Sequence, residues 1–82
     1  MKLVLYGKRN CGLCEEAKFI LNQLKYAYKF EYEEIDIYED ESLIERYGMM
    51  IPVIEMNGEI VEYGEIHKCV ISKRLTKELR VE

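Results

Sequence analysis

The side chains with the most reactive chemistry are two cysteines three positions apart, Cys11 and Cys14. They follow an apolar segment, residues 2–6, that Gly7 ends. They precede a segment in which apolar residues recur at spacings of three and four. The first segment predicts a buried strand, and the second predicts an amphipathic helix over about residues 12–27. A Cys-x-x-Cys pair at such a strand-to-helix junction indicates redox chemistry.

The start of a helix favours a thiolate over a thiol. Its unpaired N–H groups and partial positive charge stabilise an anion there, and Lys8 and Arg9 add two cations just upstream. Such surroundings lower a cysteine pKa from its usual value of about 8.5. We therefore expect Cys11, at the helix start, to attack a substrate disulfide. Cys14 lies one turn further on the same face, where it can resolve the mixed disulfide.

The spacing of the two cysteines also fits other structures. They could be two buried helix residues, or could join His67 and Cys69 in a zinc site. His67 and Cys69 are two residues apart in a predicted helix and so point to different sides, which disfavours a shared metal. An iron–sulfur cluster shared between two chains is a lesser alternative. We assign no metal ligand, and expect Cys69 to be a small buried residue.

Composition indicates one small intracellular domain. The chain has 82 residues, 49% of them apolar, and a net charge of −4, so we treat residues 1–82 as a single domain. The acidic balance disfavours nucleic acid as a partner. No apolar run approaches the roughly 18 residues that span a bilayer, and the apolar N-terminal stretch is too short for a signal peptide. Three cysteines do not suit a secreted disulfide framework, so we expect a cytoplasmic protein without membrane contact.

The rest of the chain predicts three strands and two helices. Asn57-Gly58 is the signal for a hairpin and favours a type I′ turn. A short acidic helix is expected to have Asp40 as its N-cap and Gly48 as its C′ residue. The expected elements are a strand over 30–37, a helix over about 40–47, strands over 52–56 and 59–63, and a helix over about 65–80.

The resulting order is β-α-β-α-β-β-α, an α/β fold. The first two strands are separated by a helix and should be parallel, whereas the hairpin strands should be antiparallel. Pro52 is the only proline in the chain. The pattern alone favours a trans peptide bond before it, since only about 5–6% of X–Pro bonds in folded proteins are cis.

Three stretches resemble a known family. They are Tyr6–Cys14 followed by Glu15-Glu16-Ala17-Lys18, Asp36–Gly48, and Ile51-Pro52-Val53-Ile54 with Asn57-Gly58. Together they make the chain similar, over almost its whole length, to the glutaredoxin-like members of the thioredoxin superfamily, here with a Cys-Gly-Leu-Cys motif.

The resemblance implies a thioredoxin-like fold with a four-stranded mixed sheet flanked by helices. It implies a thiol–disulfide oxidoreductase in which Cys11 is the nucleophile and Cys14 the resolving residue. It also implies a cis bond between Ile51 and Pro52 that packs against the disulfide. The Ile51 main chain would then pair with the substrate. The substrate-binding residues that we expect are Tyr6, Lys8, Arg9, Gly12, Leu13, Met50, Ile51, Pro52, Tyr63 and Gly64.

The expected partners follow from the same resemblance. We expect a monomer that acts on disulfide-containing proteins and has no tightly bound cofactor. Its electron donor is either glutathione, as a co-substrate, or a protein of the thioredoxin-reductase type.

Three departures from the family leave that choice open. Gly12-Leu13 replaces the Pro-Tyr of typical glutaredoxins and the Gly-Pro of thioredoxins, Tyr63-Gly64-Glu65 has one glycine where glutaredoxins have two, and no tryptophan precedes the motif. The alternative function is a redox-silent binding module that holds a partner along the Ile51 edge. A zinc-binding structural domain ranks behind it.

Overall fold

The computed structural model describes residues 1–79 and contains the predicted elements in the predicted order. One short 3-10 helix is added after the second strand. The elements are β1 (Leu3–Gly7), α1 (Gly12–Tyr28), β2 (Tyr32–Asp36), η1 (Ile37–Glu39), α2 (Glu41–Tyr47), β3 (Val53–Met56), β4 (Glu59–Tyr63) and α3 (Lys68–Glu78). Within residues 1–79, no helix combines the length and the apolar character needed to cross a membrane.

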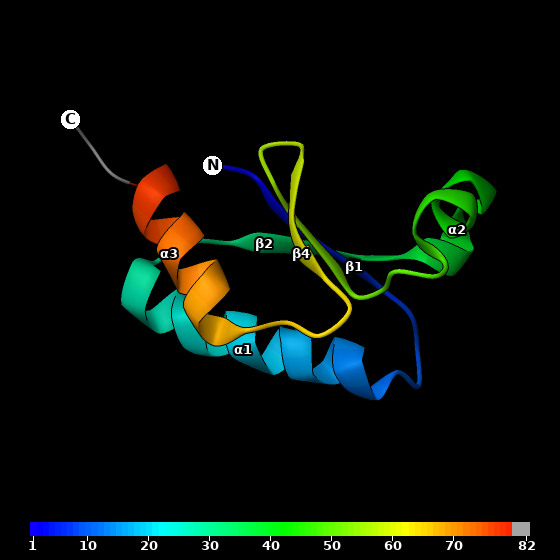
Figure 1. Ribbon diagram of the computed structural model, residues 1–82, viewed down its shortest axis with the longest axis horizontal. Coiled ribbons are helices and arrows are strands. Elements are labelled where there is room, and N and C mark those ends of the chain that lie inside the picture. Colours follow the sequence, from blue (N-terminus) through cyan, green and yellow to red (C-terminus); the bar gives the residue numbers. More distant parts are fainter. Residues whose placement is uncertain (80–82) are drawn as a thin grey trace.

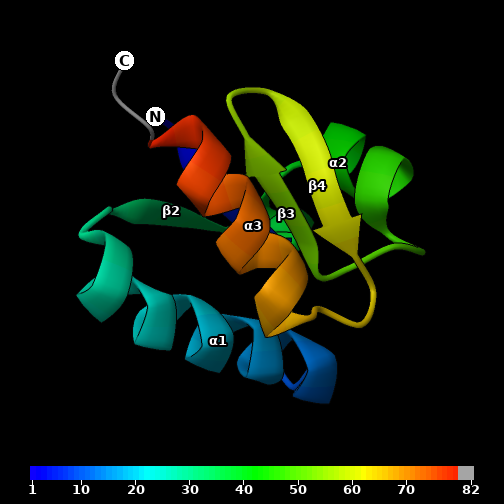
Figure 2. The same cartoon turned by 60° about the vertical axis from the view of Figure 1, so that its left-hand side comes forward.

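The four strands form one mixed sheet in the order β2-β1-β3-β4. β1 runs parallel to β2 and antiparallel to β3, and β3 pairs antiparallel with β4, which confirms both strand orientations expected from the sequence. The helices cover both faces: α3 lies in front of the sheet in Figure 2 and α2 lies behind it. In Figure 1, α1 and α3 lie together, away from α2.

Alternating side chains of β1 and β3 divide the interior into two clusters. Leu3 and Leu5 join Ile54 and Met56 in the larger cluster, with α1 and α3. Helix α1 buries Cys14, Ala17, Leu21 and Leu24, the three- and four-residue spacing that predicted it. The smaller cluster lies under α2 and contains Ile37, Tyr47 and Val53, with Tyr6, Leu43, Ile44, Met50 and Ile51 packed against it.

The predicted N-cap of α2 and the predicted hairpin turn are confirmed, whereas the predicted end of α2 differs in detail. The Asp40 carboxylate accepts a hydrogen bond from the Ser42 amide at 2.9 Å and caps α2. Asn57 and Gly58 have φ angles of 52° and 84°, as a type I′ turn requires. Gly48 ends α2, but as the C-cap with φ −55° and not as the left-handed C′ residue that we expected.

The second strand is shorter than predicted. It begins at Tyr32 and not at residue 30, and it ends at Asp36. The Asp36 carboxylate accepts a hydrogen bond from the Tyr38 amide at 2.9 Å, which turns the chain into η1, because an aspartate side chain competes with the ladder for main-chain donors. Phe30 and Ile37 are nevertheless buried. They are therefore apolar because they lie in the core, although neither belongs to the strand.

The last helix begins at Lys68, three residues later than predicted. The Glu62 carboxylate accepts a hydrogen bond from the His67 amide at 2.8 Å, which ties the residue before the helix to strand β4. Ile71 faces the core, so Cys69, two residues earlier, is turned away from it. Cys69 is exposed, and the expectation that it is buried was wrong.

The peptide bond between Ile51 and Pro52 is cis. The sequence pattern alone had favoured a trans bond, and that reading was wrong. The cis bond was expected only from the resemblance to the glutaredoxin-like family, which is confirmed on this point.

Candidate redox site

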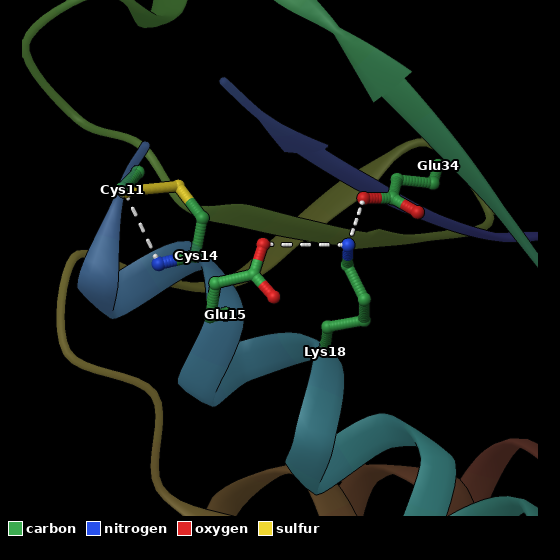
Figure 3. Close-up of a disulfide and its surroundings, with 5 residues drawn as sticks. All are labelled: Cys11, Cys14, Glu15, Lys18 and Glu34. Atoms are coloured by element: carbon green, nitrogen blue, oxygen red, sulfur yellow. Dashed lines mark hydrogen bonds and ion pairs between the residues drawn. A yellow bond between two sulfur atoms is a disulfide. The ribbon is translucent and has the colours of Figure 1, made fainter. Parts of the chain in front are cut away.

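The two cysteines of the motif are joined by a disulfide at the start of α1. Their Cα atoms lie 5.2 Å apart. Cys11 is the N-cap of the helix, and its Sγ accepts a hydrogen bond from the Cys14 amide at 3.2 Å, as Figure 3 shows. The Cys14 amide of the first turn therefore points at the Cys11 sulfur, where it can stabilise a thiolate once the disulfide is reduced.

The two sulfur-bearing residues differ in access. Cys11 is partly exposed, whereas Cys14 is only 4% exposed. Gly7, at the end of β1, lies against Cys14: a Cβ atom on Gly7 would be 3.2 Å from the Cys14 Sγ and 3.4 Å from its Cβ. A substrate disulfide can reach Cys11 more readily, which matches the roles that the sequence predicts.

One ion-pair network lies beside the disulfide. Lys18 of α1 bridges Glu15, at 3.4 Å, and Glu34 of β2, at 3.0 Å (Figure 3). Hydrogen bonding to Glu34, followed by the charges of both carboxylates, raises the pKa of Lys18. Because Glu15 lies in the first turn of α1, Lys18 offsets a negative charge that would otherwise oppose a thiolate on Cys11.

Lys8 and Arg9 are exposed and form no ion pair with any residue in the described range 1–79. With Gly7 they line an open cavity of about 300 Å³, whose other lining residues are Glu15, Lys18, Glu34, Ile35, Asp36 and Glu39. Lys8 and Arg9 thus share this cavity with the carboxylates of Glu15, Glu34, Asp36 and Glu39.

The loop that contains Pro52 reaches the same edge of the sheet. Tyr6 of β1 pairs with Val53 of β3, so the next residues along the two antiparallel strands, Gly7 and Pro52, lie at the edge where the disulfide is found. Pro52 is buried and Ile51 is partly exposed. The loop is held by the Gly64 amide, which donates to the Met50 carbonyl at 3.0 Å and to the Pro52 carbonyl at 2.8 Å.

Two stacked tyrosines belong to the cluster against which the loop before Pro52 packs. The Tyr6 and Tyr47 rings stack with centroids 4.7 Å apart, and the Tyr47 hydroxyl donates a hydrogen bond to the Glu55 carboxylate. Burial, and then that hydrogen bond and the charge of Glu55, raise the pKa of Tyr47 to about 12. Sequence reasoning placed Tyr47 on the apolar face of a helix and missed Glu55, because their contact joins α2 to β3.

Three large apolar side chains are exposed, one each in the Cys-x-x-Cys motif, in the loop before Pro52 and at the end of β4. Leu13, between the cysteines, is 44% exposed, and Tyr63, next to the Gly64 that holds the loop, is 56% exposed. Met49 is fully exposed at 101%. The sequence analysis predicted Met50 as a substrate-binding residue but not Met49. Both lie within three residues before Pro52, and this position was the only sequence signal for either of them.

The residues considered for zinc do not come together. Among residues 1–79, no three His, Cys, Asp or Glu side chains are grouped so that they could hold a metal ion. The His67 Nδ1 lies 2.7 Å from a Glu62 carboxylate oxygen instead.

Comparison with known proteins places this site in a family. The family described as "Glutaredoxin-like domain (DUF836)" matches residues 2–79. The chain belongs to this glutaredoxin-like family. That membership agrees with the resemblance carried by the Cys-Gly-Leu-Cys segment and the Ile51-Pro52 segment.

Solved structures show that the fold is shared with other proteins. Protein Ne2328 from Nitrosomonas europaea is 33% identical, with 89% of this chain and 88% of that chain covered and a TM-score of 0.77. A structural genomics target protein from X. campestris is 25% identical, with 92% and 96% covered and a TM-score of 0.78. Reduced Escherichia coli glutaredoxin, 21% identical with 96% and 98% covered and a TM-score of 0.63, shares the fold. The fold and the Cys11–Cys14 pair support a thiol redox function in general.

Proposed function

We propose that this protein is a small dithiol oxidoreductase that reduces disulfides in proteins or small molecules. The observation that carries the proposal is the asymmetry of the pair. Cys11 is partly exposed and caps α1, whereas Cys14 is bonded to it and buried against Gly7. A nucleophile needs access and a stabilised thiolate, and a resolving thiol needs only to be close to the nucleophile.

The reaction consists of two exchanges. The Cys11 thiolate attacks one sulfur of the substrate disulfide, forms a mixed disulfide and releases the other substrate sulfur as a thiolate. The Cys14 thiol, once it loses its proton, attacks the Cys11 sulfur. This closes the Cys11–Cys14 disulfide and releases the second substrate thiolate. Two electrons pass from the protein to the substrate, and an external thiol must return them.

The main chain around the pair assists the first exchange. The Cys14 amide, which donates to the Cys11 Sγ at 3.2 Å, can keep that bond when Cys11 is a thiolate. Hydrogen bonds to an ionised acceptor are about twice as strong as neutral ones. The unpaired Lys8 and Arg9 add positive potential beside the same sulfur.

The proposal also covers the compartment and the electron donor of the protein. A dithiol that must be returned to its reduced state fits a reducing compartment, so we place the protein in the cytoplasm. Glutathione and a thioredoxin-reductase-type protein are the candidate donors, and we expect the protein to work as a monomer without a tightly bound cofactor or metal.

Single-cysteine variants test the assignment of roles. With a chromogenic mixed disulfide as substrate, Cys14→Ser should accumulate one substrate adduct on Cys11, detected by intact mass. Cys11→Ser should neither form the adduct nor turn over. Cys69→Ser is the matched control and should keep wild-type turnover. Turnover by Cys11→Ser at the wild-type rate would refute the proposal and favour the redox-silent binding module.

A further inference from the structure

We infer that Glu62 is a positioning residue for disulfide exchange: its two contacts with His67 fix the segment between β4 and α3, and that segment holds the loop before Pro52. The inference rests on the proposed function, because this loop lies at the same edge of the sheet as the disulfide. It depends on hydrogen bonds that join β4, the start of α3 and the loop.

The Glu62 side chain closes the segment over residues 63–66. One of its carboxylate oxygens accepts a hydrogen bond from the His67 amide at 2.8 Å, and the other lies 2.7 Å from the His67 Nδ1. The Glu62 side chain is only 16% exposed, whereas that of His67 is 53% exposed. A carboxylate that is held at both oxygens and is largely shielded from water restrains the chain more than a solvated surface pair does.

Gly64 connects this segment to the loop before Pro52. Its amide donates to the Met50 carbonyl at 3.0 Å and to the Pro52 carbonyl at 2.8 Å. In Figure 2 the segment that follows β4 and the loop that leads into β3 lie side by side. A displacement of Gly64 would therefore weaken both hydrogen bonds and release the loop from the end of β4.

The segment has a second anchor at Ile66. This side chain is 8% exposed and belongs to the larger core cluster, so it holds the α3 end of the segment whether or not Glu62 is present. Glu65, between Gly64 and Ile66, is exposed and forms no ion pair within residues 1–79. The contact between Glu62 and His67 is thus the restraint on the β4 side, and its loss should free Gly64 while the core stays packed.

The His67 ring gives the contact a pH dependence that marks it experimentally. The charged groups around the ring are Glu62 of β4, Glu65 of the connecting segment and Lys68, the next residue on α3. Lys68 also lines a cavity with uncharged side chains of α1, which are Phe19, Asn22, Gln23 and Tyr26. The hydrogen bond to Glu62, and then the charge of Glu62, raise the pKa of His67 above 6.5. The contact is therefore strongest below pH 6.5 and weakens as pH rises through the raised pKa.

Amide hydrogen exchange at Gly64, followed by NMR, tests whether the contact holds the segment. Below pH 6.5, Glu62→Ala should speed this exchange about fivefold or more, the value of one ordinary hydrogen bond. The difference from the wild type should shrink as pH rises through the His67 pKa. Glu62→Gln keeps an acceptor for the His67 amide, so it should restore part of the protection without the pH dependence.

Glu65→Ala is the matched control, because it removes a carboxylate from the same segment without removing a hydrogen bond to His67. Its Gly64 exchange should stay within about twofold of the wild type. Unchanged Gly64 exchange in Glu62→Ala, or equal acceleration in Glu65→Ala, would overturn the inference. If Glu62→Ala does not fold, Glu62→Gln decides: wild-type protection with an unchanged pH dependence would also overturn it.

Turnover gives the functional readout. The substrate is the acetylated and amidated pentapeptide Ala-Leu-Cys-Leu-Ala as its thionitrobenzoate mixed disulfide, with dithiothreitol as reductant. Glu62→Ala should raise KM about fivefold and change kcat less than about twofold, because the loop moves while the Cys11–Cys14 pair does not. The rate of Cys11 alkylation by iodoacetamide should be unchanged.

The failure of the inference differs from the failure of the proposed function. A wild-type KM in Glu62→Ala, or a fall in kcat and in the alkylation rate at constant KM, would overturn the role of Glu62 in positioning the loop. Absence of turnover by the wild type would instead refute the proposed function, while Gly64 exchange would still decide whether Glu62 holds the segment.

Discussion

Replacing Gly7 with alanine tests how closely β1 packs against the resolving cysteine. The new Cβ would lie 3.2 Å from the Cys14 Sγ and 3.4 Å from its Cβ, a few tenths of an ångström inside ordinary contact. Gly7 is in strand β1 and does not have a positive φ angle, so the alanine backbone fits without strain. The consequence is therefore one of space.

Two opposing effects set the magnitude. Gly→Ala at a compatible backbone position stabilises a protein by about 0.4–1 kcal/mol through the unfolded state. Overpacking a buried site costs about 1–3 kcal/mol. The cost of overpacking should exceed the gain from the unfolded state, because Gly7 and Cys14 are both buried. We expect a net loss of about 1–2 kcal/mol in the free energy of unfolding.

Urea denaturation followed by circular dichroism, under reducing conditions, measures this loss. Gly12→Ala is the matched control, since no atom lies within 4 Å of a Cβ placed there, and it should not destabilise. In a Cys14→Ala background the Gly7→Ala cost should fall by about 1 kcal/mol or more, because the sulfur that it meets is gone. An equal cost in both backgrounds would refute the packing argument.

Three further predictions concern groups outside the disulfide. Tyr47→Phe removes the hydrogen bond to Glu55 and should lower the free energy of unfolding, measured in urea, by about 1–2 kcal/mol. In the wild type, ultraviolet absorbance should show one tyrosine that ionises with a pKa of about 12. Complete ionisation of all the tyrosines near pH 10 would contradict this. The hydrogen bond that the His67 ring donates to Glu62, and then the charge of Glu62, raise the pKa of His67 above its usual 6.5. The contact between protonated His67 and Glu62 stabilises the fold fully below pH 6.5, and this stabilisation is lost as pH rises through the raised pKa. Glu62→Gln should therefore lower the midpoint of the His67 titration, followed by NMR, to about 6.5. An unchanged midpoint would count against the contact. Cys69→Ser should preserve turnover of a disulfide substrate, since Cys69 is exposed on α3, and a large loss without unfolding would place Cys69 in the thiol relay.

Features set by neighbouring residues could be predicted from the sequence. The Cys-x-x-Cys pair was placed at the start of α1 because strand and helix periodicities change at Gly7. The type I′ turn followed from Asn57-Gly58, whose residues tolerate positive φ angles. The N-cap at Asp40 is likewise a contact within three residues.

Features that depend on contacts between different helices and strands could not be predicted from the sequence. The residue before α3 is tied to β4 by the hydrogen bond from the His67 amide to Glu62, a contact between elements that no local pattern encodes. The bond between Tyr47 and Glu55 joins a helix to a strand. The hydrogen bond from the Ile51 amide to the Tyr47 carbonyl depends on the course of the loop over residues 48–52, and no periodicity encodes it.

The most direct measurement of the central claim is the redox equilibrium of the pair. The Cys69→Ser protein would be equilibrated in glutathione buffers of graded potential, its remaining thiols alkylated, and its mass and peptide map determined. The account predicts a reversible two-electron disulfide that maps to Cys11 and Cys14. Both cysteines remaining reduced over the whole range would contradict it.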